Sequence, residues 1–549
     1  MRRSIAPTIL LPILTIWACQ DPQESVPLQQ SSMDSRIVEV DGIAPDLVCP
    51  GSTGCEASSG PFFVGAAKKS ITPTIETWTD LDGNGIQNGE EPFEDLNGND
   101  QWDGIWLAGF GMGRAATDVH DNVWARAISM RRGDLRIGMV ALDLIGFWYH
   151  DSIAIRVAAK DAGLEFDHIV IASTHQHEGP DTMGLWGKDP SMSGYDPNYI
   201  DFIREQAVEA LREAATSERQ ASVDYTHVEA RHLIHDSRLP EVVDPTIHAL
   251  RFVADNDDVI STAVIWGNHP EALGSENTLL TSDYPHYIRA TLEEAYENSV
   301  SVFFSGLLGG LMTTIGIVGC PDLDGIETCP QGTFERAEYV GVSVAQQIIE
   351  SFESGTVVSE STPDLSCIRN SFLAPLSNDV FVYGFKIGLL ERDGYLLEDG
   401  TRVESAKLSE VDLASILSDF GLGTEVSSVV IGPLEIASVP GELYPELFLT
   451  TPDGGSYVEF PENADFFGAQ AEPPIQQLMR SDKAQAIINN SSDALGYIIP
   501  KAQFDYSPPY AYAPDGQYGE QNSTGEELAG TIAEAFEHMS NLRASSPLP

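Results

Sequence analysis

Three histidines of this chain stand at positions from which their rings could bind one metal ion. His175 and His177 directly follow the β-branched run 167–174, which is typical of a buried strand. Residues two apart in a strand point to the same face, so we expect both rings to converge just beyond the strand's end, where Gly179 and Pro180 turn the chain away. Two imidazoles supply only half of a zinc site, and a hydrogen-bonded pair near a turn would have the same pattern.

Later segments offer the missing ligands. The apolar run 259–266 leads into Gly-Asn-His-Pro, so His269 also stands where a strand gives way to a turn. The strand-like run 429–439 ends in Pro-Gly-Glu, which places Glu442 at the same topological level, and Tyr497 follows in a further apolar segment. Spacing alone leaves two interpretations open. We favour a shared zinc site, and the alternative is that these are unrelated turn residues.

A calcium-binding pattern precedes the histidines. Residues 80–91 fit the loop D-x-[DN]-x-[DN]-G-x5-E at every specified position, whereas a second copy at 95–106 lacks the closing Glu. The flanks do not have the spacing of amphipathic helices, so we expect isolated loops in an insertion at about 77–107, and a polar loop without an ion is the alternative. The predicted Ca²⁺ ligands of the first loop are Asp80, Asp82, Asn84, Glu91 and the backbone carbonyl of Ile86.

The N-terminus has the pattern of an export signal. Arg2 and Arg3 precede the apolar run 9–17, and the Ile-Trp-Ala-Cys that ends at Cys19 resembles a bacterial lipobox. We predict a signal peptide over 1–18, lipidation of Cys19 and a flexible tether over 19–60. The expected location is the bacterial cell envelope, at the outer membrane or cell surface, with the lipid anchor as the membrane contact; ordinary secretion is the alternative.

The charge balance excludes one class of partner. The 549 residues include 83 Asp and Glu against 30 Lys and Arg, a formal net charge of −53. A polyanion would be repelled at long range, so we exclude nucleic acid as a partner and expect a small-molecule or lipid substrate.

Export permits disulfide bonds, and five cysteines follow Cys19. Cys49 with Cys55, and Cys320 with Cys329, are close enough to close short loops. Cys367 is then unpaired, or it replaces one member of the later pair. Because no CxxC spacing occurs, a thiolate metal site is not expected.

Strand-like and helix-like patterns alternate along the rest of the chain, which predicts an α/β fold. We expect a mixed β-sheet with flanking helices in one domain over 61–545. The main segments are strands at 123–130, 136–144 and 259–266, and helices at 152–162, 198–215 and 526–542.

Several short motifs occur in the order seen in the neutral/alkaline ceramidases, and the chain resembles that family over roughly residues 62–530. They are Phe63-Val64-Gly65-Ala66-Ala67, Ile71-Thr72-Pro73, Gly109-Phe110-Gly111, Ala125-Arg126-Ala127, Ala141-Leu142-Asp143, Ser173 to Pro180, Asn268-His269-Pro270 and Pro440-Gly441-Glu442. The resemblance implies an amide-cleaving catalytic domain that holds one zinc ion at His175, His177, His269, Glu442 and Tyr497. It also implies that Arg238 lies near the scissile amide.

The chain departs from the family at three places. Met312 stands where the family has its serine, and a thioether cannot accept an acyl group. Attack by zinc-bound water is our first expectation, ahead of Thr313 or Thr314 as nucleophile or an inactive chain. Glu178 replaces a small residue and is a candidate general base or imidazole support, with a solvent-exposed turn residue as the alternative. The immunoglobulin-like module that follows in ceramidases is not expected here.

The sequence therefore predicts an exported zinc-dependent hydrolase that resembles neutral ceramidase and cleaves an amide or ester bond, with Ca²⁺ stabilising the inserted loop. The alternative is a catalytically inactive surface lipoprotein of the same fold that binds a lipid or a protein.

Overall fold

The computed structural model describes residues 42–53, 55, 59–83, 86–317, 319–320, 328–408 and 419–545. The predicted signal peptide over 1–18, the lipidation site Cys19, the first part of the tether and the calcium ligand Asn84 lie outside these residues. Within the described part of the chain, no helix is long and apolar enough to cross a membrane.

Among the described residues, nine strands form the larger of two mixed sheets. β5 and β6 pair in parallel, as do β10 and β12, and the other neighbours are antiparallel. Beside the main path, β14 (Val358–Glu360) pairs with β7. The spatial order is β12 (Val300–Ser305), β10 (Val259–Trp266), β9 (Thr246–Ala254), β7 (Arg219–Glu229), β2 (Phe62–Ser70), β4 (Trp124–Arg132), β5 (Leu135–Leu142) and β6 (His168–Ser173).

The second sheet has seven described strands and is mainly antiparallel. β19 and β21 are its parallel pair. The main path runs through β1 (Leu47–Cys49), β15 (Leu365–Pro375), β18 (Phe420–Ile431), β16 (Gly394–Leu396) and β17 (Arg402–Val403). Beside this path, β19 (Leu434–Ser438) pairs with β18, and β21 (Ala484–Ile488) pairs with β19.

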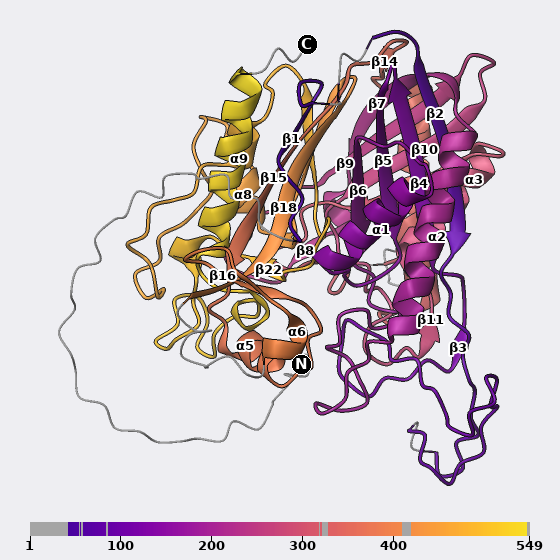
Figure 1. Cartoon of the computed structure of the whole chain (residues 1–549), viewed down its shortest axis with the longest axis vertical. Coiled ribbons are helices and arrows are strands. Elements are labelled where there is room, and N and C mark those ends of the chain that lie inside the picture. Colours follow the sequence, from indigo (N-terminus) through magenta and orange to yellow (C-terminus); the bar gives the residue numbers. More distant parts are fainter. Residues whose placement is uncertain are drawn as a thin grey trace.

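Helices cover the outer faces of both sheets, and the inner faces pack against each other (Figure 1). α2 begins at Pro197 because Asp196 caps the first turn, and its buried residues recur at helical spacing against β2 and β4. The helices on the larger sheet are α1 (Tyr149–Asp161), α2 (Pro197–Thr216), α3 (Tyr284–Ala295) and α4 (Phe334–Ser354), and α9 (Leu528–Ser545) covers the smaller sheet.

Shorter elements lie in the connections between these layers. They are the helices α5 (Asp379–Lys386), α6 (Ser405–Leu408) and α8 (Pro445–Phe448), the 3-10 helices η1 (Arg231–Leu233), η2 (Ile475–Leu478), η3 (Lys501–Gln503) and η4 (Glu520–Asn522), and the two-residue strands β3 (Asp118–Val119), β8 (His235–Asp236), β11 (Leu279–Leu280), β13 (Met312–Thr313), β20 (Glu442–Leu443) and β22 (Tyr497–Ile498).

The predicted mixed α/β fold is confirmed, and two of its details were wrong. The run 429–439 is not one strand, because Gly432 turns the chain with a positive φ of 53° between β18 and β19. The predicted tether over 19–60 extends too far, because β1 pairs with β15 and residues 47–49 are therefore part of the sheet.

The cysteine pairing follows the first of the two expected arrangements. Cys49 is bonded to Cys55 and Cys320 to Cys329, and Cys367 is a buried free thiol in β15.

Candidate metal centre

The three predicted histidines converge between the two sheets, beyond the ends of β6 and β10. The ring centroid of His175 lies 5.2 Å from that of His177 and 5.1 Å from that of His269. One ligand nitrogen from each ring lies within 4.8 Å of the other two, and all three residues are buried. Strands far apart in the sequence thus bring these imidazoles into one cluster.

The backbone reaches this geometry by a turn and not by the extended strand that we predicted. β6 ends at Ser173, and His175 has a left-handed φ of 61°, which costs a non-glycine residue about 1 to 3 kcal/mol. The His175 amide donates to the Leu144 carbonyl oxygen (2.9 Å), and Nδ1 lies 2.6 Å from the Ile145 carbonyl oxygen. These contacts leave Nε2 directed away from the backbone.

Glu442 joins two of the histidines. Its Oε2 lies 3.0 Å from Nε2 of His269, and its Oε1 lies 3.4 Å from Nε2 of His175. Burial alone would raise the pKa of the Glu442 carboxyl, but the two adjacent imidazoles outweigh burial and hold that pKa well below its usual range. The carboxylate is therefore charged and faces both Nε2 atoms.

The donor set fits a divalent cation. Both ring nitrogens of His177 are buried without a hydrogen-bond partner, although buried polar atoms are nearly always paired. Burial, then the charges of His175 and His269, lower the pKa of His177 well below its usual value, which keeps its imidazole neutral. Burial also acts to lower the pKa of His269, but the hydrogen bond and the charge of Glu442 outweigh burial and raise that pKa to about 9, so a bound cation would have to displace that proton. Imidazole nitrogens and a carboxylate oxygen are ligands that zinc prefers.

Tyr497 lies beside the candidate carboxylate ligand Glu442. β20 and β22 pair in parallel with Glu442 opposite Tyr497. Burial, then the charge of Glu442, raise the pKa of Tyr497 well above its usual value, so the phenol is neutral.

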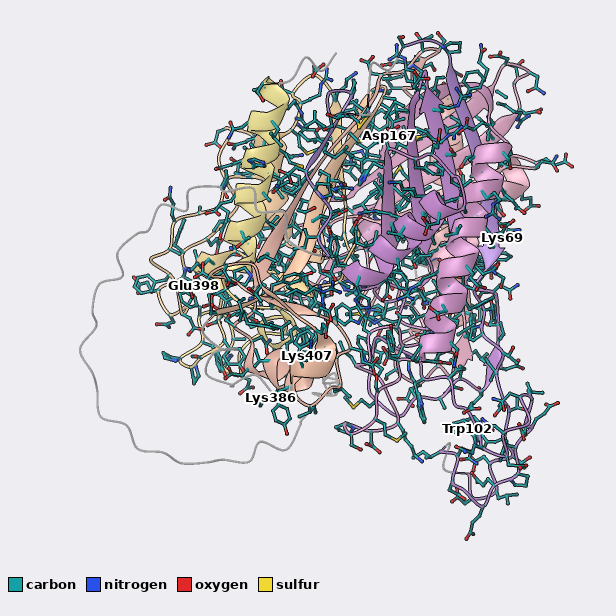
Figure 2. All side chains as sticks on the ribbon, in the orientation of Figure 1. Lys69, Trp102, Asp167, Lys386, Glu398 and Lys407 are labelled. Carbon is teal, nitrogen blue, oxygen red and sulfur yellow. A yellow bond between two sulfur atoms is a disulfide. The ribbon has the colours of Figure 1, made fainter. Side chains whose placement is uncertain are left out.

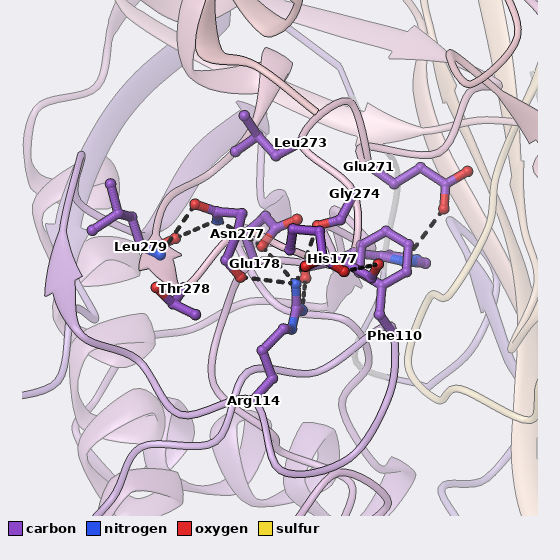
Figure 3. A network of polar contacts seen from close by, with 12 residues as sticks. Phe110, Arg114, His177, Glu178, Glu271, Leu273, Gly274, Asn277, Thr278 and Leu279 are labelled. Atoms are coloured by element: carbon purple, nitrogen blue, oxygen red, sulfur yellow. Dashed lines mark hydrogen bonds and ion pairs between the residues drawn. The ribbon is translucent and has the colours of Figure 1, made fainter. Parts of the chain in front are cut away.

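Glu271 is a member of this centre that the sequence analysis missed. It follows His269 by two residues, and its Oε2 lies 3.5 Å from Nδ1 of His177 while Oε1 accepts a hydrogen bond from the Thr313 hydroxyl. Figure 3 shows the contact between Glu271 and His177. A carboxylate so close to a candidate ligand in Asn-His-Pro-Glu was the available signal.

Glu178 is fully buried, so the solvent-exposed turn alternative is wrong. Its Oε2 accepts hydrogen bonds from Arg114 (2.9 Å) and Asn277 (2.8 Å), as Figure 3 shows. Arg114 also donates to the backbone carbonyl of His177. Glu178 therefore braces the loop that carries His177, and its part as general base stays a prediction.

Gly109 explains the glycine-dense segment ahead of the histidines. Its φ is 98°, and a Cβ atom at this position would overlap the Cβ and Cγ of His177. The ring of Phe110 then lies edge-on to the His177 ring, with centroids 5.0 Å apart. The segment thus packs against a candidate ligand, which requires glycine at the point of closest approach.

The remaining predicted catalytic residues lie outside the cavity described below. Arg238 is buried in a two-bond ion pair with Glu520 (2.6 and 3.0 Å). Thr313 and Met312 form the short strand β13, in which the Met312 side chain is fully buried in the core under α3 and α4.

A largely apolar cavity of about 230 Å³ adjoins the histidines. Its polar lining comprises His175, His177, Glu442 and Tyr497 together with Asn490, Tyr518, Gln521, Asn522 and Thr524. Its apolar lining includes Trp148, Met183, Leu185, Trp186, Phe381, Phe385, Leu390, Leu422 and Leu495.

The inserted loop at 77–107 stands away from the two sheets, around Trp102 in Figure 2. One carboxylate oxygen from each of Asp80, Asp82 and Glu91 lies within 4.8 Å of the other two. The Glu91 carboxylate also accepts the amides of Leu81 (2.7 Å) and Asn88 (3.1 Å). Three of the predicted calcium ligands therefore converge, and Ile86 is exposed at the loop surface.

Comparison with known proteins supports the fold. No protein-family model and no curated protein sequence matches the chain. Neutral ceramidase from Pseudomonas aeruginosa matches it with a TM-score of 0.59 and 15% identity, covering 89% of this chain and 75% of that one. A ceramidase complexed with C2 matches with a TM-score of 0.60 and 14% identity, covering 89% and 76%. The chain therefore has a ceramidase-like fold.

Proposed function

We propose that the protein is a metal-dependent hydrolase that cleaves an amide or ester bond in a substrate carrying a long apolar chain. The observation that carries this proposal is the placement of His175, His177 and Glu442 in the wall of a largely apolar cavity. The ceramidase-like fold supports the reaction class.

In this proposal the polar side chains hold the cation and the apolar side chains bind the substrate. His175, His177, His269 and Glu442 would hold the cation, with Tyr497 beside them. Zinc bound there would supply Lewis-acid polarisation of the substrate carbonyl. The apolar walls would bind the hydrocarbon chain and exclude bulk water, which strengthens electrostatic interactions in the site.

The acyl acceptor is best supplied by water. Met312 has no nucleophilic atom, and neither Thr313 nor Thr314 lines the cavity. The Thr313 hydroxyl already donates a hydrogen bond to the Glu271 carboxylate. These positions disfavour a covalent acyl-enzyme and favour direct hydrolysis. The lack of a nucleophile at position 312 also motivates a competing proposal, in which the protein is a non-catalytic surface protein that binds a lipid or a protein.

Hydrolysis of an N-acyl series decides between the two proposals. We expect kcat/KM to rise by about fourfold for each methylene that the cavity buries, because each is worth about 0.8 kcal/mol, and turnover to stop when the metal is chelated. The measurement is product release from matched short-, medium- and long-chain amides and esters. Stoichiometric zinc with no turnover of any member would overturn the hydrolase and leave the binding protein.

We also propose that the inserted loop binds Ca²⁺ through Asp80, Asp82, Asn84, Ile86 and Glu91. Calcium that binds the folded state alone stabilises it, by about 2.7 kcal/mol at a hundredfold excess over Kd. Chelation should therefore speed proteolytic cleavage within 80–106, and Glu91→Gln should reproduce that effect without chelator. Identical cleavage with and without Ca²⁺ would contradict calcium binding by this loop. Glu90→Gln is the matched control and should be cleaved like wild type.

The envelope location is proposed on the lipobox-like residues alone. An exported lipoprotein anchored at Cys19 would hold the catalytic body beside a source of lipid substrates. Metabolic labelling with a fatty acid tests it, since Cys19→Ser should abolish incorporation.

A further inference from the structure

An oxygen atom lies near Nδ1 of each of the three imidazoles, and the one near His177 differs from the other two because it belongs to a side chain and makes a longer ion-pair contact, not a hydrogen bond. A backbone carbonyl oxygen lies 2.6 Å from Nδ1 in His175 and in His269. In His177 the corresponding group is the side-chain carboxylate of Glu271, at 3.5 Å. An acceptor at Nδ1 fixes the tautomer in which Nε2 presents its lone pair, which is the form that binds metal through Nε2.

The carboxylate of Glu271 is set back from the cavity and contacts His177. His177 lines the cavity, whereas Glu271 and Thr313 do not, and only 13% of the Glu271 side chain is exposed. The Thr313 hydroxyl holds Oε1 of Glu271, which leaves Oε2 for the imidazole. The order of contacts is thus Thr313, Glu271, His177 and then the cavity.

The same two-residue strand supports a second histidine. The Met312 carbonyl oxygen accepts from both the backbone amide and Nδ1 of His269, at 2.9 and 2.6 Å. β13 therefore fixes His269 through its backbone and His177 through Thr313 and Glu271. The position where the ceramidase resemblance placed a nucleophile serves here as a support for two candidate metal ligands.

We propose that Glu271 is a positioning residue that orients His177 for metal binding, and that Thr313 holds Glu271 in place. The proposal rests on the proposed function only in that His177 binds the cation. A carboxylate that supports a metal-binding imidazole raises the basicity of the ligand as well as fixing its orientation, and loss of such a group weakens metal affinity by about 10- to 100-fold.

Zinc affinity of the variants tests the proposal without reference to turnover. Affinity is measured by competition with a chromophoric chelator, and the visible spectrum of the Co²⁺-substituted protein reports the ligand geometry. We expect Glu271→Ala to bind zinc about 10- to 100-fold more weakly with an altered Co²⁺ spectrum. Glu271→Gln, which keeps the shape and offers an amide oxygen, should show a smaller loss, as should Thr313→Val. Glu276→Ala, an exposed glutamate of the same loop, is the matched control and should match wild type.

The outcomes separate this proposal from the proposed function. Wild-type affinity and spectrum in Glu271→Ala, together with weakened binding in His177→Ala, would overturn the role of Glu271 and leave the hydrolase intact. Zinc binding without turnover in wild type would overturn the hydrolase, while the affinity series would still decide on Glu271. If Glu271→Ala does not fold, Glu271→Gln and Thr313→Val carry the test, and wild-type zinc affinity in both would overturn it.

Discussion

His269→Ala is expected to abolish stoichiometric metal binding and all metal-dependent hydrolysis while the protein stays folded. The substitution removes one ligand and also takes away the closest partner of Glu442, at 3.0 Å. Removing a ligand should weaken affinity beyond the roughly 10- to 100-fold that loss of a supporting group causes. Metal content after dialysis and circular dichroism together measure the effect.

A matched variant distinguishes the loss of a metal ligand from a general loss of structure. His248 lies in β9 of the same sheet, outside the cluster, and its Nδ1 is 2.9 Å from the Tyr225 hydroxyl. His248→Ala should keep its metal and its activity. Full metal content in His269→Ala would remove His269 from the ligand set.

Arg238→Met is expected to destabilise the protein strongly, and replacement of Glu520 as well should restore most of the loss. Arg238 donates to both oxygens of Glu520 and to the Tyr518 carbonyl, and the paired side chains are 2% and 3% exposed. Removing one partner of such a buried pair costs about 3 to 5 kcal/mol, because the other charge is left without compensation. Burial acts to lower the pKa of Arg238, but its interactions with Tyr444 and with the Glu520 carboxylate outweigh burial and raise that pKa.

The double variant Arg238→Met with Glu520→Leu distinguishes a structural arginine from one that binds substrate. The free energy of unfolding from denaturant titration should return toward wild type in the double variant, and kcat should be retained, because the guanidinium is committed to Glu520 and does not line the cavity. A stable double variant that has lost kcat would contradict this account and place Arg238 at the substrate, as the ceramidase resemblance implies.

Much of the candidate metal centre could be predicted because polar residues at strand ends leave a local signal. His175, His177, His269 and Glu442 each follow an apolar run closely. Their convergence was not predictable from such local patterns, because β6 and β10 are not neighbours in the larger sheet and β19 belongs to the smaller one. The turn at His175 was not predictable in the same way, because its left-handed backbone depends on the Leu144 and Ile145 carbonyls, which a neighbouring strand positions.

Contacts between distant segments account for what the sequence analysis missed. Glu178 was expected to act as a general base, to support an imidazole or to face solvent, and its pairing with Arg114 joins residues 64 positions apart. The support of Glu271 by Thr313 spans 42 positions. The split of the strands into two sheets likewise depends on packing between β18 and its neighbours, although the Gly432 turn that divides the run 429–439 was visible in the sequence.

The central claim is that the histidine cluster holds a metal ion, and metal analysis of the purified, untagged protein tests it most directly. We expect about one zinc ion per chain after dialysis, removable by a chelator and restored by added zinc. Absence of any tightly bound divalent cation, even after incubation with zinc, would contradict the ligand assignment and the hydrolase built on it.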